Sequence, residues 1–198
     1  MKTVSRLLPA LVVALMANPV LAHTGQGEAH GLAHGFVHPL MGLDHVLAMV
    51  GVGLIAARIG GRAQVLVPLA FLAMMVVGGM LGASGNGLPF VEVGIALSVV
   101  LIGLAVALRL ALPTAAAMAL VGLFAVFHGQ AHGAEMPEAA SALSYGFGFI
   151  AATALLHAVG LGLGYGLGRL ASGGDRPALR LTGAGLALAG VGLLVGAI

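Results

Sequence analysis

The side chains best suited to metal chemistry open a hydrophobic stretch of the sequence. His38, Asp44 and His45 lie close together there, and Pro39 predicts a helix start, because the N–H that proline lacks is left unpaired in a first helical turn anyway. From that start, His38, Met41 and His45 fall at i, i+3 and i+7, on one face of a helix. Imidazole, carboxylate and thioether donors together favour a transition metal. The alternative is helix capping and packing near the lipid headgroups.

A second group of the same donor types lies much later in the sequence. His128, His132 and Glu135 stand at i, i+4 and i+7, again on one helical face. Histidine pairs at i, i+4 recur in helical metal sites. Alternatively, Gly129 and Gly133 unwind the helix end and expose backbone carbonyls to a cavity.

Two further ionisable residues lie inside hydrophobic segments. Glu92 follows Pro89 closely, and it either joins a metal site or merely complements the positive end of a helix dipole. His157 falls near the middle of its segment and either packs there through a hydrogen bond or lies on an ion path.

Composition restricts the protein to one class. The 198 residues are 60% hydrophobic and 7% charged, whereas a soluble domain carries about 25% charged residues. A mean hydropathy of +1.13 agrees with an integral membrane protein. The absence of cysteine excludes disulfides and thiolate metal sites. The net charge of +2 comes from a few basic residues whose placement indicates membrane topology and no nucleic-acid partner.

Residues 1–22 have the pattern of a secretory signal peptide. Lys2 and Arg6 precede an apolar core over 7–16, and a small-residue cleavage site ends at Ala22. The core is too short to cross a bilayer of about 30 Å. Cleavage would leave His23 first, so that its amine and imidazole form a chelating pair; the alternative is an uncleaved anchor. Residues 23–37 are rich in Gly and His, and we expect a flexible segment outside the cytoplasm that captures metal weakly.

Six hydrophobic segments follow, each near the length of about 20 residues that a spanning helix needs. Lys and Arg occur only in the first, third and fifth connections between them, which predicts that these connections are cytoplasmic. The sequence therefore predicts an all-α, multi-pass protein of the bacterial inner membrane, with both ends of the mature chain outside and one six-helix transport domain over 23–198. The segments run at about 39–57, 64–83, 89–108, 113–130, 141–168 and 181–198.

This topology places the ligand-type residues on one side of the membrane. The first and third segments begin there, and the fourth ends there, so both metal-suited groups and Glu92 share the outer half of the bilayer. A site for a divalent transition metal on the outer side explains that distribution.

These residues also carry a family resemblance over the whole chain. The stretches His38-Pro-Leu-Met-Gly-Leu-Asp44-His45 and Phe127-His-Gly-Gln-Ala-His-Gly-Ala-Glu135 resemble the two signatures of the HupE/UreJ family, without departure in either. Members are membrane proteins associated with hydrogenase and urease assembly and are regarded as nickel permeases. The resemblance implies uptake of Ni²⁺, with Co²⁺, Cu or Zn²⁺ as other cargoes. The positions it marks are His38, Asp44, His45, Glu92, His128, His132 and Glu135.

Three functions fit these observations. We expect a permease, with no catalytic cofactor and no enzymatic activity, whose partners are the metal ion and the bilayer. The alternatives are an intramembrane metal-dependent hydrolase, in which histidines and a carboxylate hold Zn²⁺, and a membrane-anchored metal sensor or chaperone. The oligomeric state is open, with a homo-oligomer among the possibilities.

Overall fold

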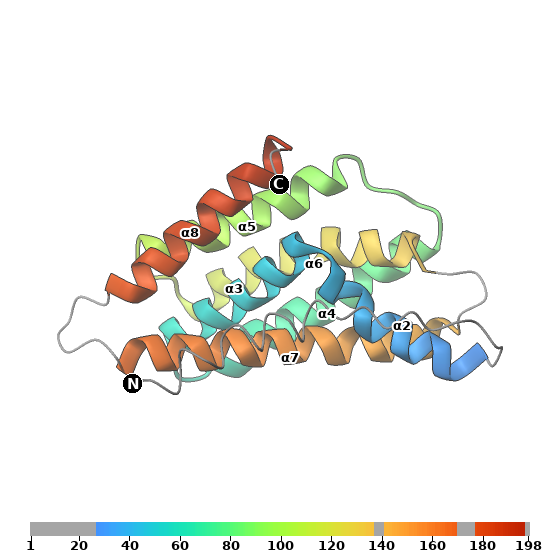
Figure 1. The fold of residues 1–198 in the computed structure, drawn as a ribbon, viewed down its shortest axis with the longest axis horizontal. Helices are drawn as coiled ribbons and strands as arrows, with labels where there is room; N and C mark the ends of the chain where they lie inside the picture. The colour runs from blue at the N-terminus through green and yellow to red at the C-terminus, as the bar shows by residue number, and fades with distance from the viewer. Residues whose placement is uncertain (1–26, 137–140, 170–176, 197–198) are drawn as a thin grey trace, which may run out of the picture.

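A computed structural model describes residues 27–136, 141–169 and 177–196, and this part of the chain is built from α-helices (Figure 1). The predicted all-α class is therefore confirmed, and the helix bounds lie within a few residues of the predicted segments. The signal peptide and His23 lie outside the described residues. The helices are α2 (Gly27–Met41), α3 (Leu43–Ile59), α4 (Ala63–Ala83), α5 (Val91–Ala107), α6 (Thr114–Ala134), α7 (Ala142–Arg169) and α8 (Pro177–Leu194).

Length and composition make four of these helices candidate membrane spans, namely α4, α6, α7 and α8. A fifth candidate is α2 together with α3, a pair bent by 85°. The apolar helix α5 has 17 residues, which at 1.5 Å per residue falls short of a bilayer core of about 30 Å. Large apolar side chains such as Val65, Leu123 and Leu188 are exposed around the bundle, as expected where lipid replaces water. The chain is thus a multi-pass membrane protein.

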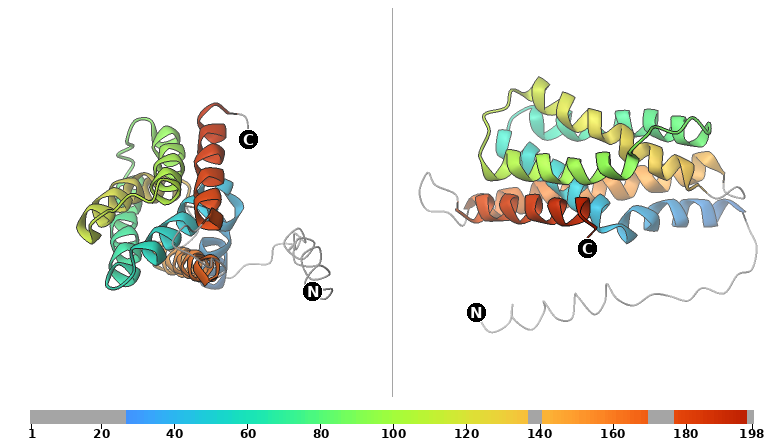
Figure 2. Two further views of the ribbon diagram at one scale, coloured as in Figure 1. Left: turned by 90° about the vertical axis from the view of Figure 1, so that its left-hand side faces the viewer. Right: turned by 90° about the horizontal axis from the view of Figure 1, so that it is seen from above.

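Glycines bring the helices together in four close pairs: α4 with α6, α3 with α7, α5 with α8, and α2 with α7 (Figures 1 and 2). At each pair, a Cβ atom added to the glycine would collide with the backbone of the partner helix, so only glycine permits this approach. The numbers of the contacting residues rise together in the pair α4 and α6 and in the pair α3 and α7, so these helices run parallel. In the pair α5 and α8 one number rises as the other falls, so these helices run antiparallel. Examples of these close approaches are the contacts of Gly133 with Gly79, of Gly160 with Val50, and of Gly183 with Gly103.

The start of the first hydrophobic segment differs from the prediction. Pro39 does not begin a helix; it lies in the last turn of α2, which continues to Met41. The chain then breaks at Gly42, whose extended backbone (φ −93°, ψ 116°) precedes α3. The expectation of a flexible segment is also wrong from Gly27 onward. The reason is tertiary: α2 packs tightly on α7, because Gly35 lies directly against the Tyr145 backbone.

The two ends of the bundle differ chemically. At one end, Arg58 in the last turn of α3 donates hydrogen bonds to the carbonyl oxygens of Leu110 (2.6 Å) and Ala105 (3.5 Å), which ties this end of α3 to the end of α5 and the connection after it. At the opposite end, α3, α5 and α7 begin and α4 and α6 finish. The histidines gather there.

Candidate metal centre

Four imidazoles form a continuous row at this second end. The ring centroid of His132 lies 4.8 Å from that of His38 and 4.2 Å from that of His45, and the His45 ring lies 4.8 Å from that of His128. The row runs from the partly exposed His38 to His128, which is fully buried. Helices α2, α3 and α6 each contribute to it. The sequence prediction that these separated segments share one site is consistent with this geometry.

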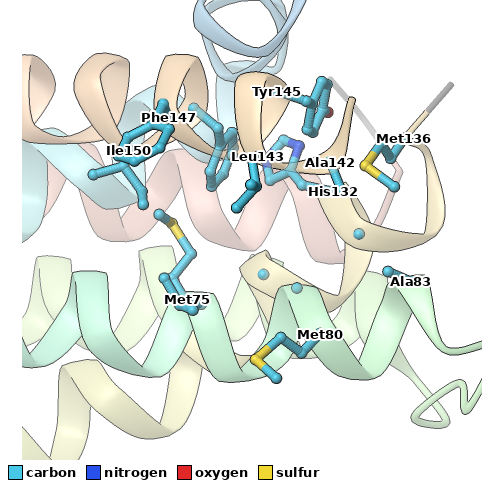
Figure 3. Close-up of a pocket in the computed structure, with 16 residues that line it drawn as sticks. Met75, Met80, Ala83, His132, Met136, Ala142, Leu143, Tyr145, Phe147 and Ile150 are labelled. Atoms are coloured by element: carbon cyan, nitrogen blue, oxygen red, sulfur yellow. The ribbon is translucent and has the colours of Figure 1, made fainter. Parts of the chain in front are cut away.

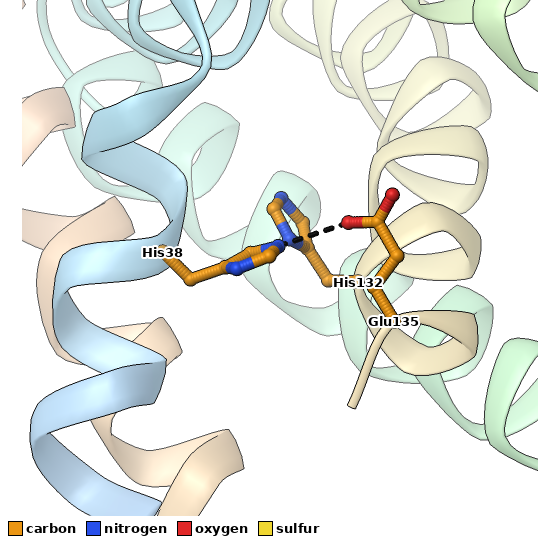
Figure 4. A group of neighbouring side chains, drawn as sticks. All are labelled: His38, His132 and Glu135. Carbon is orange, nitrogen blue, oxygen red and sulfur yellow. Dashed lines mark hydrogen bonds and ion pairs between the residues drawn. The ribbon is translucent and has the colours of Figure 1, made fainter. Parts of the chain in front are cut away.

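The outer end of the row is a group of three donors, His38, His132 and Glu135 (Figure 4). One ligand atom from each lies within 4.8 Å of the others. The His38 Nε2 atom is 3.0 Å from Glu135 Oε2, and the Glu135 carboxylate is more than half exposed. Two imidazoles and a carboxylate form a mixed nitrogen and oxygen set of the kind that suits divalent transition metals.

Farther in, Asp44 fixes the protonation of His45. The carboxylate oxygen Oδ1 of Asp44 accepts hydrogen bonds from the backbone N–H and the ring Nδ1 of His45, both at 2.7 Å. An ionised carboxylate only accepts, so the ring proton lies on Nδ1 and the Nε2 lone pair is free. Nε2 is buried without a hydrogen-bond partner among the described residues. In many metal sites, a carboxylate accepts a hydrogen bond from the ligating histidine in this way and so orients its ring.

Ser98 has the same effect on His128. The Ser98 hydroxyl donates its one proton to the Ile95 carbonyl oxygen at 2.6 Å. It must therefore accept the 2.9 Å hydrogen bond from His128, which places the ring proton of His128 on Nε2. The Nδ1 lone pair of His128 is then free, and within the described part of the chain this buried atom has no partner.

His132 links the outer and inner parts of the row. It is 4% exposed, its ring also packs on Phe149 at 4.1 Å, and neither of its nitrogens has a partner among the residues described. Leaving one buried acceptor unpaired costs about 1–3 kcal/mol. Three adjacent imidazoles with nitrogens unpaired among the described residues therefore destabilise the fold unless a cation or water binds them.

Repeated glycines explain how these histidines are positioned. The pattern His-Gly-x-Ala-His-Gly occurs at 30–35 in α2 and at 128–133 in α6. In α6, Gly129 lies against the Met75 backbone and Gly133 against Gly79, whereas in α2 Gly35 lies against Tyr145. The helix α6 stays regular through Ala134, so its glycines serve close packing and do not unwind the end.

The predicted ligands do not all meet. Glu92 is exposed in the first turn of α5, outside the three-donor group, which agrees with the helix-dipole alternative. His23 lies outside the described residues. Sequence reasoning missed Ser98, which carried no motif signal. It also missed the place of His34, whose ring stacks on His38 with centroids 5.8 Å apart; the i, i+4 spacing of this pair was the available signal.

An apolar cavity of about 360 Å³ opens beside the row between α4, α6 and α7 (Figure 3). His132 contributes an imidazole to its wall, and Met75, Met80 and Met136 contribute thioethers. The cavity thus extends from the outer end of the bundle, at Met136, to the buried Met75.

Comparison with known proteins gives one consistent result. The family described as "HupE / UreJ protein" matches residues 11–193. The chain is 46% identical over 185 residues to Protein HupE of Rhizobium leguminosarum bv. viciae, which covers 93% of this chain and 95% of that protein. No solved structure matches significantly.

Proposed function

The chain belongs to the HupE/UreJ family, and from that premise we propose that it is a permease that takes up a divalent transition metal, foremost Ni²⁺, across the bacterial inner membrane. The observation that carries this proposal is the row of His38, His132, His45 and His128. Its buried members have nitrogens without a hydrogen-bond partner among the described residues, and a carboxylate, Glu135, lies at its exposed end.

The proposal includes the finer topology. After removal of residues 1–22, six spans cross the bilayer, with α3 and α5 each counted as a span and both ends of the mature chain outside. The helix α2 then lies at the outer face and covers the entrance. The arginine-rich end of the bundle is cytoplasmic, which the positive-inside rule supports.

In this mechanism the ion enters at Glu135 and His38 and moves inward along the imidazoles. Glu135 and Asp44 offset its charge, while the imidazoles provide neutral donors. Glu92, exposed near the same face, attracts cations toward the entrance. Conduction requires sites that bind well enough to load and weakly enough to release. His132 meets this need because it borders both His38 and His45 and can pass the ion between them.

Transport fits the geometry better than hydrolysis or sensing. A catalytic zinc needs three protein ligands around one point with an open position for water. His38, His132 and Glu135 offer such a set, but the imidazoles continue inward beyond it to the fully buried His128, and a series of this kind suits an ion that moves. We therefore propose that the protein is not an enzyme and needs no catalytic cofactor, and that its partners are the ion and lipid. Transport requires no nucleic acid, and a homo-oligomer is compatible with it.

Uptake of radioactive nickel by cells that produce the protein tests this function. Replacement of His132 by alanine should lower the uptake rate at least tenfold, because the ion loses the ligand shared by both parts of the row. The control is Leu123→Ala, which truncates an exposed side chain on the same helix as His132 and should leave uptake unchanged. Wild-type uptake by His132→Ala at equal protein level would refute the proposed path.

A further inference from the structure

A fourth buried imidazole among the described residues, that of His157, lies apart from the row. It is 3% exposed near the middle of α7, and both its ring nitrogens lack hydrogen-bond partners within the described chain. A histidine that serves only packing normally pairs at least one nitrogen, because an unpaired buried polar atom destabilises the fold. An apolar side chain of similar size would pack here without that cost. The two unpaired nitrogens of His157 therefore favour a bound ligand at this position.

The surroundings of His157 supply further donors. Thr153 lies four residues earlier, on the same face of α7, and its hydroxyl donates to the Met75 sulfur at 3.7 Å. On α4, Phe71 and Met75 are likewise four residues apart, and the Phe71 ring meets His157 edge-to-face with centroids 5.1 Å apart. One face of α4 thus lies against one face of α7. The imidazole of His157, the hydroxyl of Thr153 and the thioether of Met75 thus lie on these two facing surfaces, all buried.

Two structural links join this place to the outer histidines. The Phe71 ring contacts His128 as well as His157, with a centroid distance of 5.6 Å to the former. The apolar cavity beside His132 reaches Met75, whose sulfur Thr153 contacts (Figure 3). The Phe71 ring and the cavity thus connect the outer row with the buried residues between α4 and α7.

We propose that His157, together with Met75 and Thr153, forms a second, inward station for the transported divalent metal, and that the Phe71 ring separates it from the outer row. This station rests on the proposed transport function and extends the ion path to mid-membrane. A single imidazole with two weak donors binds a metal less tightly than the outer row does. The ion therefore resides there briefly and continues toward the cytoplasm, as conduction through successive sites requires.

The test replaces His157 by leucine, which removes both nitrogens while keeping an apolar side chain of comparable size. Two quantities are measured: nickel uptake per folded protein molecule in cells, and Ni²⁺ binding to the purified full chain by equilibrium dialysis. We expect uptake to fall at least tenfold, saturation binding to fall by one ion per chain, and the affinity of the outer site to stay within twofold of the wild type. His157→Gln, which keeps a polar side chain but ligates metal poorly, should behave in the same way.

The control is Leu156→Ala, which truncates the neighbouring buried side chain on α7 without removing a donor. Its uptake per folded molecule should equal that of the wild type, so a loss seen only in the His157 variants cannot come from reduced packing. Wild-type uptake per folded molecule in both His157 variants would overturn the inward station while leaving the proposed function intact. The proposed function itself fails if the wild type takes up no nickel, or if His132→Ala takes it up normally.

Discussion

In His45 and His128, a hydrogen bond at one ring nitrogen leaves the lone pair of the other ring nitrogen free. Asp44 accepts a hydrogen bond from the Nδ1–H of His45, and Ser98 accepts one from the Nε2–H of His128, so the two rings present opposite nitrogens. In each case the partner fixes the tautomer and the ring orientation. The partners are therefore as important to the site as the ligands themselves.

Replacement of Ser98 by alanine tests this at the residue scale. The variant leaves the Nε2–H of His128 without an acceptor, so the ring is free to rotate or change tautomer. We expect the affinity for Ni²⁺, measured by calorimetric titration of the purified protein, to fall about 10- to 100-fold. Ser84→Ala is the control, because it removes an exposed hydroxyl that bonds a helix-end carbonyl and the Asn86 side-chain amide but no imidazole. Unchanged affinity in Ser98→Ala would show that His128 does not bind the ion.

Asp44→Asn changes charge at nearly constant shape. The amide oxygen can still accept a hydrogen bond from His45, but the negative charge that supports the ring and offsets the metal is lost. We expect nickel uptake to be abolished, with protein level and topology preserved on immunoblots and in reporter fusions. If Asp44→Asn and His45→Ala both transported at the wild-type rate, the opening stretch would not be the site.

At the scale of elements, the joint between α2 and α3 is the critical feature. The 85° bend lets His38 on α2 and His45 on α3 approach His132 from two helices. Gly42 forms this joint, and its backbone angles would allow any residue. The restriction is spatial: a Cβ there would fall 2.7 Å from Asp44 Oδ1 and 2.9 Å from His45 Nδ1.

Gly42→Ala should therefore displace the hydrogen bond between Asp44 and His45 without unfolding either helix. We expect nickel uptake to fall about tenfold, since the lost orientation of a ligand commonly costs 10- to 100-fold in affinity. Circular dichroism should show unchanged helix content. Gly162→Ala is the matched control, because a Cβ there meets no atom of the described residues within 4 Å and should leave uptake as it is. Equal uptake by the two variants would contradict this account of the joint.

At the scale of the whole molecule, the bundle has a histidine-rich end and an arginine-rich end, and the mechanism requires the first to face outward. Reporter fusions after Gly61 and after Ser172 should give a cytoplasmic signal, and a fusion after Pro137 a periplasmic one, because basic residues occur only in alternate connections. A cytoplasmic signal at Pro137 would place the site on the wrong side for uptake.

N-terminal sequencing of the purified protein should begin at His23; a start at Met1 would remove the chelating amine.

The sequence by itself determined the class of the molecule and the donor residues, because composition and spacing along single helices are local properties. Low charge and segment length indicated a multi-pass helical membrane protein, and the i, i+4 pair His128 and His132 indicated a metal site. Only the tertiary structure decided how helices rotate and approach one another, since this depends on which glycines meet a partner backbone. It placed His132 between His38 and His45, left Glu92 exposed, and continued α2 through Pro39 to the break at Gly42. Periodicity within one helix carries no information about such contacts between helices.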